Sequence, residues 1–267
     1  MWAFFLLILA IACISVLLIT APTQGAVTTD NRMEPLTLHA IFGLWDDGPM
    51  PDSYQENLEG WKALGWNVRV WNKPEVEALI QSEFPEDWDM YQTLPKMGQK
   101  TDWARYFILY HLGGFYTDCD CKPNPKSNLL QRIKRPLDRF YSFIEDHITK
   151  EQAIQVAKNN AIRKGVPEIH GARLANYFFG CPARHPALKK VMDLARQRCK
   201  ENPVDEGNTN GYLCLYCTGP CAFTTALHGD RSIIRWEHKK DFIHTCSHAW
   251  LSRNAKRKQK ELESGIQ

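Results

Sequence analysis

The stretch KTDWARYFILYHLGGFYTDCDCKP, residues 100–123, decides the fold because it joins a helical pattern, a glycine pair, a strand and an acidic loop. Its aromatic residues recur at helical spacing and the glycines end that pattern, so a helix is predicted over 98–114. The apolar run FYTD that follows predicts a strand. That strand would present two aspartates, Asp118 and Asp120, at its carboxyl end.

The rest of the chain continues this alternation of strands and helices. Further strands are predicted over 35–45, 66–71, 139–146, 175–182 and 231–236. Further helices are predicted over 53–65, 74–84, 185–199 and 218–230, with an irregular stretch over 85–97. Such alternation is typical of an α/β sandwich whose parallel strands carry ligand loops at their carboxyl ends.

The first twenty residues, MWAFFLLILAIACISVLLIT, contain no charged side chain. As a helix rising 1.5 Å per residue, the apolar run from Trp2 to Ile19 reaches about 27 Å, enough to cross a thin bilayer. The pattern favours a membrane anchor over a cleaved signal peptide, although TQGA at 23–26 offers small residues for cleavage. The predicted organisation is an anchor at 1–20, a linker at 21–34, one domain at 35–252 and a basic tail at 253–267.

Charge and cysteine content limit the classes of binding partner and of cellular compartment that the sequence suits. The net charge of +3 is spread along the chain outside the basic tail, so no nucleic-acid partner is expected. Nine cysteines are present; one, Cys13, lies in the apolar segment, and the remaining eight suit disulfides in a lumenal compartment, with a pairing that the sequence does not reveal. A zinc site built on CLYCTGPC (214–221) and HTCSH (244–248) is a second interpretation, and disulfides or buried thiols are favoured over it.

The acidic loop has a chemistry of its own. Two carboxylates this close repel each other, so they favour a cation, a shared proton or full exposure to water. Mg²⁺ and Mn²⁺ are commonly bound by one or two protein carboxylates, with phosphate and water as the other ligands. A cation at Asp118 and Asp120 would neutralise charge that grows on a diphosphate when a sugar leaves it. An Asp-x-Asp pattern alone is more often a solvated turn.

Several blocks carry a resemblance to one enzyme family. The stretch 100–123 resembles the central region of glycosyltransferase family 32, which includes fungal Golgi mannosyltransferases and inositol-phosphoceramide mannosyltransferases. LHAIFGLWDDGPMPDSYQENLEGWKALGWNVRVWN resembles its opening segment, NYFFGCPARHPALKKVMD and YCTGPCAFTTAL its later blocks, and HTCSHAW its closing block. The blocks follow one another in order over residues 36–252.

The resemblance implies an α/β fold of the GT-A type, with a single nucleotide-sugar-binding domain. It implies a retaining transfer that depends on Mn²⁺ or Mg²⁺. The donor would be a UDP- or GDP-hexose, and the acceptor a hydroxyl of a glycan, glycolipid or sphingolipid. The protein would be a single-pass membrane protein of the secretory pathway, in the Golgi, with its catalytic domain in the lumen.

The resemblance also implies roles for individual residues. Asp118 and Asp120 resemble the aspartates that bind the metal and the donor sugar, and His244 is a further candidate metal ligand. The donor-binding candidates are Trp45, Gly114, Asp118, His248 and Trp250. Without the resemblance, Trp45 is interpreted as a core residue and the histidines as polar surface residues.

The remaining candidates are catalytic. Asp102 and Arg105 lie three apart on one helical face and resemble the pair that positions donor hydroxyls and stabilises charge. Asn176 falls where the family has a strand beside the acceptor. Without the resemblance, the first two are interpreted as a surface or half-buried ion pair, and the third as a strand-edge asparagine.

Two other classes of protein are alternatives. A phosphohydrolase with an Asp-x-Asp nucleophile and acid would carry that motif after its first strand, whereas DCDC lies in the middle of this chain. A non-catalytic carbohydrate-binding relative would share the fold, but it would have no need of the aspartates and the arginine.

Overall fold

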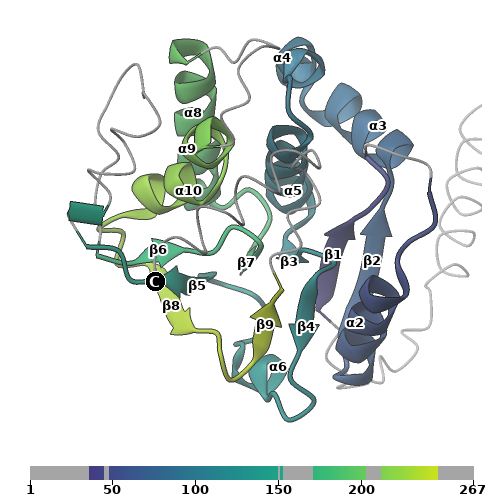
Figure 1. Cartoon of the computed structure of the whole chain (residues 1–267). Coiled ribbons are helices and arrows are strands. Elements are labelled where there is room, and N and C mark those ends of the chain that lie inside the picture. Colours follow the sequence, from purple (N-terminus) through teal and green to yellow (C-terminus); the bar gives the residue numbers. More distant parts are fainter. Residues whose placement is uncertain (1–35, 45–47, 150, 153–170, 203–211, 246–267) are drawn as a thin grey trace, which may run out of the picture. The chain divides into compact units, whose positions relative to one another are not determined.

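The structure, a computed structural model, describes residues 36–44, 48–149, 151–152, 171–202 and 212–245. All of them belong to one unit of the chain, Pro35–Gln267 (Figure 1). The strands of the main sheet are β1 (Thr37–Ile41), β2 (Asn67–Trp71), β3 (Gly114–Thr117), β5 (Phe140–Asp146), β6 (Arg173–Leu174), β7 (Phe178–Cys181) and β8 (Ile233–Glu237). Their order is β2-β1-β3-β7-β5-β6, and β8 pairs with β5.

The first half of this sheet is parallel. β1 pairs in parallel with β2 and with β3. Parallel neighbours need a crossover, and helices provide it here. The helix α2 (Asp52–Ala63) connects β1 to β2, and the helices between β2 and β3 are α3 (Lys73–Glu83), α4 (Trp88–Thr93) and α5 (Met97–Leu112). The carboxyl ends of the three strands therefore lie at one edge of the sheet.

The second half is mixed, because β7 runs antiparallel to both β3 and β5, while β5 and β8 are parallel. The predicted parallel arrangement is thus correct for β2-β1-β3 and wrong for β7. Apolar runs in buried strands do not reveal strand direction. The antiparallel register sets Thr117 opposite Phe178. It thereby brings the residues before β7 to the carboxyl end of β3.

A second, two-stranded sheet begins at the end of the acidic loop. The strands β4 (Cys121–Pro123) and β9 (Phe242–His244) pair antiparallel, with Cys121 opposite His244. Neither strand was predicted, because three residues are too few to show an alternating pattern. This small ladder brings the end of the described chain to the acidic loop.

The core fills both faces of the main sheet. Successive strand residues point to opposite faces. Tyr116 and Phe179 accordingly pack in one cluster with α5, and Phe115 and Phe178 in another with Trp61 of α2. The first cluster also receives α8 (Pro186–Glu201) and α10 (Pro220–Leu227), and the second receives α6 (Leu129–Arg132). The α/β fold class is therefore confirmed.

Most predicted elements are present, with three differences. The stretch 85–97 was predicted to be irregular, but it contains the 3-10 turn η1 (Pro85–Asp87) and the helix α4. The segment predicted as one helix at 218–230 begins only at Pro220, after the separate helix α9 (Tyr212–Cys217). The predicted strand 175–182 is shorter, because only Phe178–Cys181 pairs, and β6 precedes it.

Several expectations concern residues outside the described ranges. These include the anchor at 1–20, the linker at 21–34, the basic tail at 253–267, and Cys13 and Cys246. Within the described ranges, the helices are too short or too polar to span a membrane. No disulfide joins any two of the seven described cysteines.

Candidate active site

The acidic loop leaves the carboxyl end of β3 and is held by main-chain hydrogen bonds. The Asp118 amide donates to the Tyr177 carbonyl oxygen at 2.9 Å, and the Cys121 amide donates to the Asp118 carbonyl oxygen at 3.1 Å. The second bond closes a tight turn through DCDC. It separates the two aspartates, because Asp118 directly follows β3 of the main sheet and Asp120 directly precedes β4 of the small one.

Helix α2 holds the other side of this loop through two buried side chains. Asn57 Nδ2 donates to the Cys119 carbonyl oxygen at 3.0 Å. One helical turn later, Trp61 Nε1 donates to the Cys121 carbonyl oxygen at 3.1 Å. The Cys119 side chain is buried, and its thiol donates to the Ile41 carbonyl oxygen at 3.4 Å. The loop is therefore pinned to the fold by both helix and strand.

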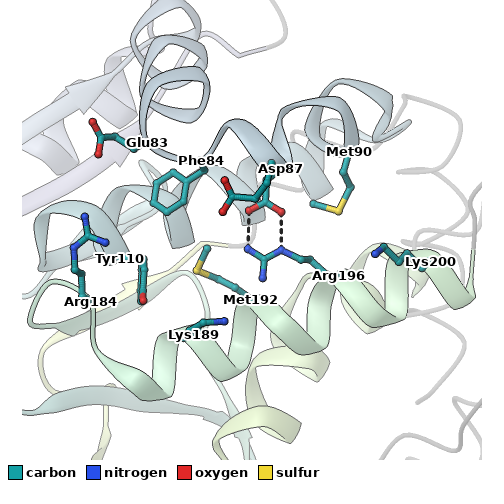
Figure 2. Close-up of a pocket in the computed structure, with 11 residues that line it drawn as sticks. Glu83, Phe84, Asp87, Met90, Tyr110, Arg184, Lys189, Met192, Arg196 and Lys200 are labelled. Carbon is teal, nitrogen blue, oxygen red and sulfur yellow. Dashed lines mark hydrogen bonds and ion pairs between the residues drawn. The ribbon is translucent and has the colours of Figure 1, made fainter.

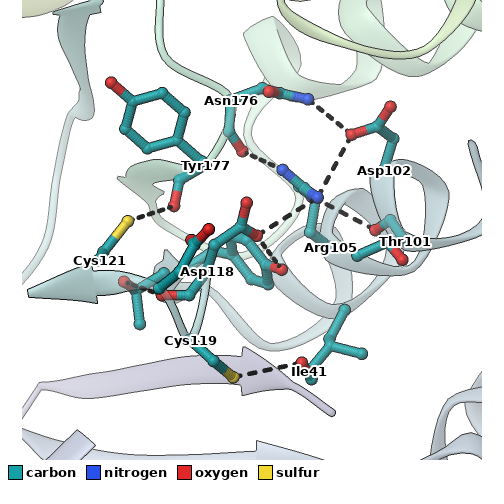
Figure 3. A network of polar contacts seen from close by, with 12 residues as sticks. Ile41, Thr101, Asp102, Arg105, Asp118, Cys119, Cys121, Asn176 and Tyr177 are labelled. Atoms are coloured by element: carbon teal, nitrogen blue, oxygen red, sulfur yellow. Dashed lines mark hydrogen bonds and ion pairs between the residues drawn. The ribbon is translucent and has the colours of Figure 1, made fainter. Parts of the chain in front are cut away.

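Arg105 is the centre of the polar network shown in Figure 3. Its Nη2 atom lies 3.3 Å from Asp102 Oδ1 and 3.4 Å from Asp118 Oδ1. Its Nη1 atom donates to the Asn176 carbonyl oxygen at 2.8 Å. Burial opposes the charge on Arg105, but the neighbouring carboxylates, Asp118 foremost, outweigh it and raise the pKa of the guanidinium. Arg105 is thus a buried, permanent cation between two carboxylates.

Asp102 is buried, and hydrogen bonds hold both of its oxygens. Asn176 Nδ2 donates to Oδ1 at 2.8 Å, and the Thr218 hydroxyl donates to Oδ2 at 2.7 Å. Burial raises the pKa of Asp102 to about 6, although Arg105 and these two donors act in the opposite direction. The i,i+3 pair expected from the sequence is present, but it lies in the core rather than at the surface.

Asn176 links the network to the second half of the sheet. It is 4% exposed, and its carbonyl oxygen and side-chain amide bind Arg105 and Asp102 respectively. Its Nδ2 also donates to the Tyr106 hydroxyl at 3.3 Å, and that hydroxyl donates to the Thr218 carbonyl oxygen at 2.6 Å. Tyr106 and Thr218 were not predicted, because no pattern marks residues that meet only through the fold.

Asp118 has the more accessible side chain of the network, at 27% exposure against 6% for Arg105. The Tyr116 hydroxyl donates to its Oδ1 atom at 2.7 Å. Burial raises the pKa of Asp118, Arg105 opposes that rise, and Asp120 adds to it. Asp118 is consequently a carboxylate oriented by two neighbours and open on one side.

Asp120 and His244 form a second pair. His244 Nε2 lies 3.1 Å from Asp120 Oδ1, and the imidazole stacks on the Tyr177 ring with centroids 3.8 Å apart. The Asp120 carbonyl oxygen accepts from the amide and hydroxyl of Thr245, at 3.1 and 3.0 Å. The structure therefore brings together two of the three predicted metal ligands, Asp120 and His244, although they lie far apart in the sequence.

One group of three potential metal ligands gathers in the described part of the chain: Asp120, Cys121 and His244, with ligand atoms within 4.8 Å of one another. Asp118 is not part of this group and lies in the Arg105 network instead. The cysteines of CLYCTGPC form no such group within the described ranges, so the zinc interpretation gains no support there.

Gly114, a donor-binding candidate, has a structural constraint. Its φ is +96°, and a Cβ built on it would lie 2.8 Å from the Thr37 carbonyl oxygen and 3.2 Å from His39 Nε2. His39, which was not predicted, contacts the Gly113 carbonyl oxygen through Nε2 at 3.1 Å and accepts from Trp71 Nε1 at its Nδ1 atom. Burial lowers its pKa to about 4. A neutral His39 therefore stabilises the turn at Gly113 and Gly114 by its contact with the Gly113 carbonyl oxygen.

Three predicted donor-binding residues, Trp45, His248 and Trp250, lie outside the described residues.

A cavity of about 560 Å³ lies between α8 and the η1–α4 segment, and neither Asp118 nor Asp120 lines it. Figure 2 shows that the guanidinium of Arg196 meets the carboxylate of Asp87 in it, through two contacts of 2.6 Å. Its lining shares no residue with the Arg105 network or with the Asp120–His244 pair. The candidate site is therefore the charged network and not this cavity.

A known protein family matches the part of the chain that contains this network. Residues 45–135 match a family described as a glycosyltransferase sugar-binding region containing a DXD motif. The resemblance to glycosyltransferase family 32 is confirmed. The matching segment includes Asp102, Arg105 and the acidic loop with both aspartates, whereas Asn176 and His244 lie beyond it.

Two fungal proteins are similar to part of the chain. "Inositol phosphoceramide mannosyltransferase 1" of Schizosaccharomyces pombe is 30% identical over 99 residues, which cover 34% of this chain and 31% of that protein. "Putative glycosyltransferase HOC1" of Saccharomyces cerevisiae is 30% identical over 104 residues, covering 37% and 26%. The matches thus span less than a third of the length of either relative.

Solved glycosyltransferases show a distant likeness. The PaToxG glycosyltransferase has a TM-score of 0.41 at 15% identity, covering 73% of this chain and 70% of that one. The ligand-free glycosyltransferase domain of the YGT toxin has a TM-score of 0.43 at 11% identity, covering 76% and 80%.

Proposed function

We propose that this chain is a retaining glycosyltransferase that moves a hexose from a nucleotide-diphosphate sugar to an acceptor hydroxyl with the help of a divalent cation. One observation carries the proposal: the Asp118–Arg105 pair and the Asp120–His244 pair stand at the two ends of one three-residue turn. Transfer from a diphosphate needs a cation for the leaving group and oriented groups for the sugar, and this turn offers both.

The donor set suits a divalent cation. Asp120 offers a carboxylate oxygen and His244 an imidazole nitrogen, and they already lie in contact. Mg²⁺ is bound mainly through oxygen, so the nitrogen ligand favours Mn²⁺. Cys121 suits such an ion less well, because burial raises the pKa of its thiol far above the usual range and keeps it protonated. When bound, the cation would neutralise charge on the diphosphate.

Asp118 is assigned to the donor sugar. Tyr116 and Arg105 hold its Oδ1 atom, and the side chain is still partly exposed. An oriented, accessible carboxylate is suited to accept hydrogen bonds from sugar hydroxyls. The same contacts make its Oδ1 atom a poor nucleophile, because Tyr116 and Arg105 already bind that oxygen. We therefore favour a same-face transfer, in which the leaving phosphate oxygen helps to remove the acceptor proton.

Asp102 and Asn176 are assigned positioning roles. Both residues are buried and bind one another, so they act on the donor through Arg105 and Asp118. Arg105 supplies positive charge beside the sugar-binding carboxylate. Pre-organised charge of this kind needs no rearrangement during the reaction.

The donor, acceptor and location are proposed from the similar proteins and from the first twenty residues. The printed name of the Schizosaccharomyces pombe relative supports a mannose-type hexose and a sphingolipid acceptor. A UDP-hexose donor and a glycan or glycolipid acceptor are alternatives of the same class. The apolar stretch at 1–20 supports a membrane anchor, and the similarity to the two fungal relatives supports a protein of the secretory pathway with its site in the lumen.

The test is release of nucleotide diphosphate by the full chain from a panel of UDP- and GDP-hexoses, with Mn²⁺, Mg²⁺ or a chelator. We expect hydrolysis of one donor, lost on chelation and lost in Asp118→Asn. Asp193→Asn, which changes an exposed aspartate of α8, is the matched control and is expected to retain activity. Equal release by Asp118→Asn and the natural chain would overturn the proposal. Cleavage of a simple phosphate ester instead would favour a phosphohydrolase.

A further inference from the structure

The ends of α8 and α9 bring two cysteines, Cys199 and Cys217, close to one another. Cys217, the last residue of α9, is fully buried, and its Sγ atom lies 3.7 Å from the carbonyl oxygen of Arg198, the residue before Cys199. The carbon of that carbonyl is bonded to the amide nitrogen of Cys199, so the Cys217 thiol lies beside Cys199. A second contact holds the same segments, because Arg198 Nη1 donates to the Tyr216 carbonyl oxygen at 3.0 Å. The backbone next to both thiols is therefore fixed.

We propose that Cys199 and Cys217 form a disulfide in the folded chain under oxidising conditions. Cysteines held far apart cannot be bridged without moving the backbone, whereas two cysteines on neighbouring segments need little more than a rotation of their side chains. The crosslink would tie the end of α8 to the end of α9, two helices that also pack against α10 (Figure 1).

Other cysteines of the described chain are less suited. Cys119 and Cys121 contact main-chain carbonyl oxygens from the buried acidic loop, and Cys181 is buried in β7. Cys214 lies one turn before Cys217 on α9 and is the competing partner for Cys199. The contact with the main chain next to Cys199 is made by the Cys217 Sγ atom, which lies 3.7 Å from the Arg198 carbonyl oxygen.

Exposure sets the order of the chemical steps. Cys199 is partly exposed and Cys217 is not, so an external oxidant reaches Cys199 first. With oxidised glutathione, the Cys199 thiolate attacks one sulfur, releases one glutathione thiolate and forms a mixed disulfide. Cys217 then loses its proton to the released thiolate, attacks the Cys199 sulfur and releases the second glutathione. Two protein thiols lose two electrons, and one glutathione disulfide becomes two thiols.

The crosslink would act on the candidate site through Thr218, the residue after Cys217. The Thr218 hydroxyl donates to Asp102, and its carbonyl oxygen accepts from Tyr106. Fixing Cys217 on α8 would hold this residue in place. An effect of the crosslink on activity rests on the proposed function, whereas the formation of the crosslink is independent of that function.

The first test is chemical. The purified full chain is equilibrated with oxidised and reduced glutathione, denatured, blocked with iodoacetamide and digested without reduction. We expect mass spectrometry to find the peptide of Cys199 linked to that of Cys217 in the oxidised sample and both peptides alkylated in the reduced one. Alkylation of both residues in the oxidised sample, or a link from Cys199 to Cys214 or Cys221, would overturn the proposal.

The second test is thermal. Reduction is expected to lower the melting temperature of the natural chain by on the order of 5 °C. Cys217→Ala should show no such shift, and Cys181→Ala, a matched change of another buried cysteine, should keep it. If Cys217→Ala does not fold, the partly exposed Cys199→Ser serves instead. A shift that persists in the variant would contradict the pairing. Neither readout involves sugar transfer, so each proposal stands or fails alone.

Discussion

Replacing Asp102 by asparagine removes a buried negative charge that lowers the stability of the folded chain. Burial raises the pKa of this carboxyl from 3.8 to about 6. The folded chain therefore binds a proton there that the unfolded chain has already released, over the range between these two values. The stabilisation is complete below pH 3.8 and is lost as the pH rises through 6. A difference of about two pKa units amounts to about 3 kcal/mol.

The asparagine side chain has the same shape and does not ionise. Its oxygen can accept from Asn176, and its amide can donate to the Thr218 hydroxyl, while Arg105 keeps Asp118 as its partner. Rearranging one buried hydrogen bond costs about 1 kcal/mol. We therefore expect Asp102→Asn to raise the free energy of unfolding at pH 7.5 by about 2 kcal/mol, and by much less at pH 4.5.

Urea unfolding at the two pH values measures this effect, with Asp193→Asn as the exposed control. A destabilised Asp102→Asn at pH 7.5, or a gain of equal size at both pH values, would refute the reasoning. Donor hydrolysis is expected to fall by about tenfold or more in the same variant, since the carboxylate that orients Asn176 is lost. Full activity would contradict the positioning role.

Three further predictions concern the glycine turn and the cation. Gly114→Ala should lower the free energy of unfolding in urea by about 2–4 kcal/mol, because it adds a main-chain clash to a positive φ. The control is Gly229→Ala, at φ +70°, where the added Cβ would meet no heavy atom of another part of the described chain within 4 Å; it should lower the free energy of unfolding by about 1–2 kcal/mol. His39 has a lowered pKa of about 4, so stability should fall by up to about 3 kcal/mol as the pH drops from 6.5 towards 4; His39→Gln should remove this dependence, and the exposed His147→Gln should leave it. His244→Ala should weaken Mn²⁺ binding, measured calorimetrically, by at least about tenfold, and an unchanged affinity would exclude His244 as a ligand.

The elements around the candidate site were predictable to different degrees. The helix 98–114 and the strand after it were predicted within a few residues, because a long periodic pattern ending at two glycines leaves little choice. The ladder of β4 and β9 was not, since strands of three residues carry no pattern of their own. The antiparallel direction of β7 was missed because a buried apolar run looks the same in either direction.

The candidate residues divide in the same way. Asp102 and Arg105 were predictable as a pair, because a helix sets neighbours three residues apart on one face. His39, Tyr106 and Thr218 were not, since each meets the network only through a contact distant in sequence. Their signal in the sequence is no stronger than that of any other polar residue in a buried segment.

By itself, the sequence determined the α/β alternation, the acidic loop after a strand and the ion pair on α5, because each follows from short-range spacing. Only the tertiary structure decided that Asp118 belongs with Arg105 and Asp120 with His244. A tight turn sends neighbouring side chains in different directions, and their partners arrive from β9 and α5, which no local rule connects. Burial, another tertiary property, then makes Asp102 an acid with a pKa near 6 instead of an ordinary surface carboxylate.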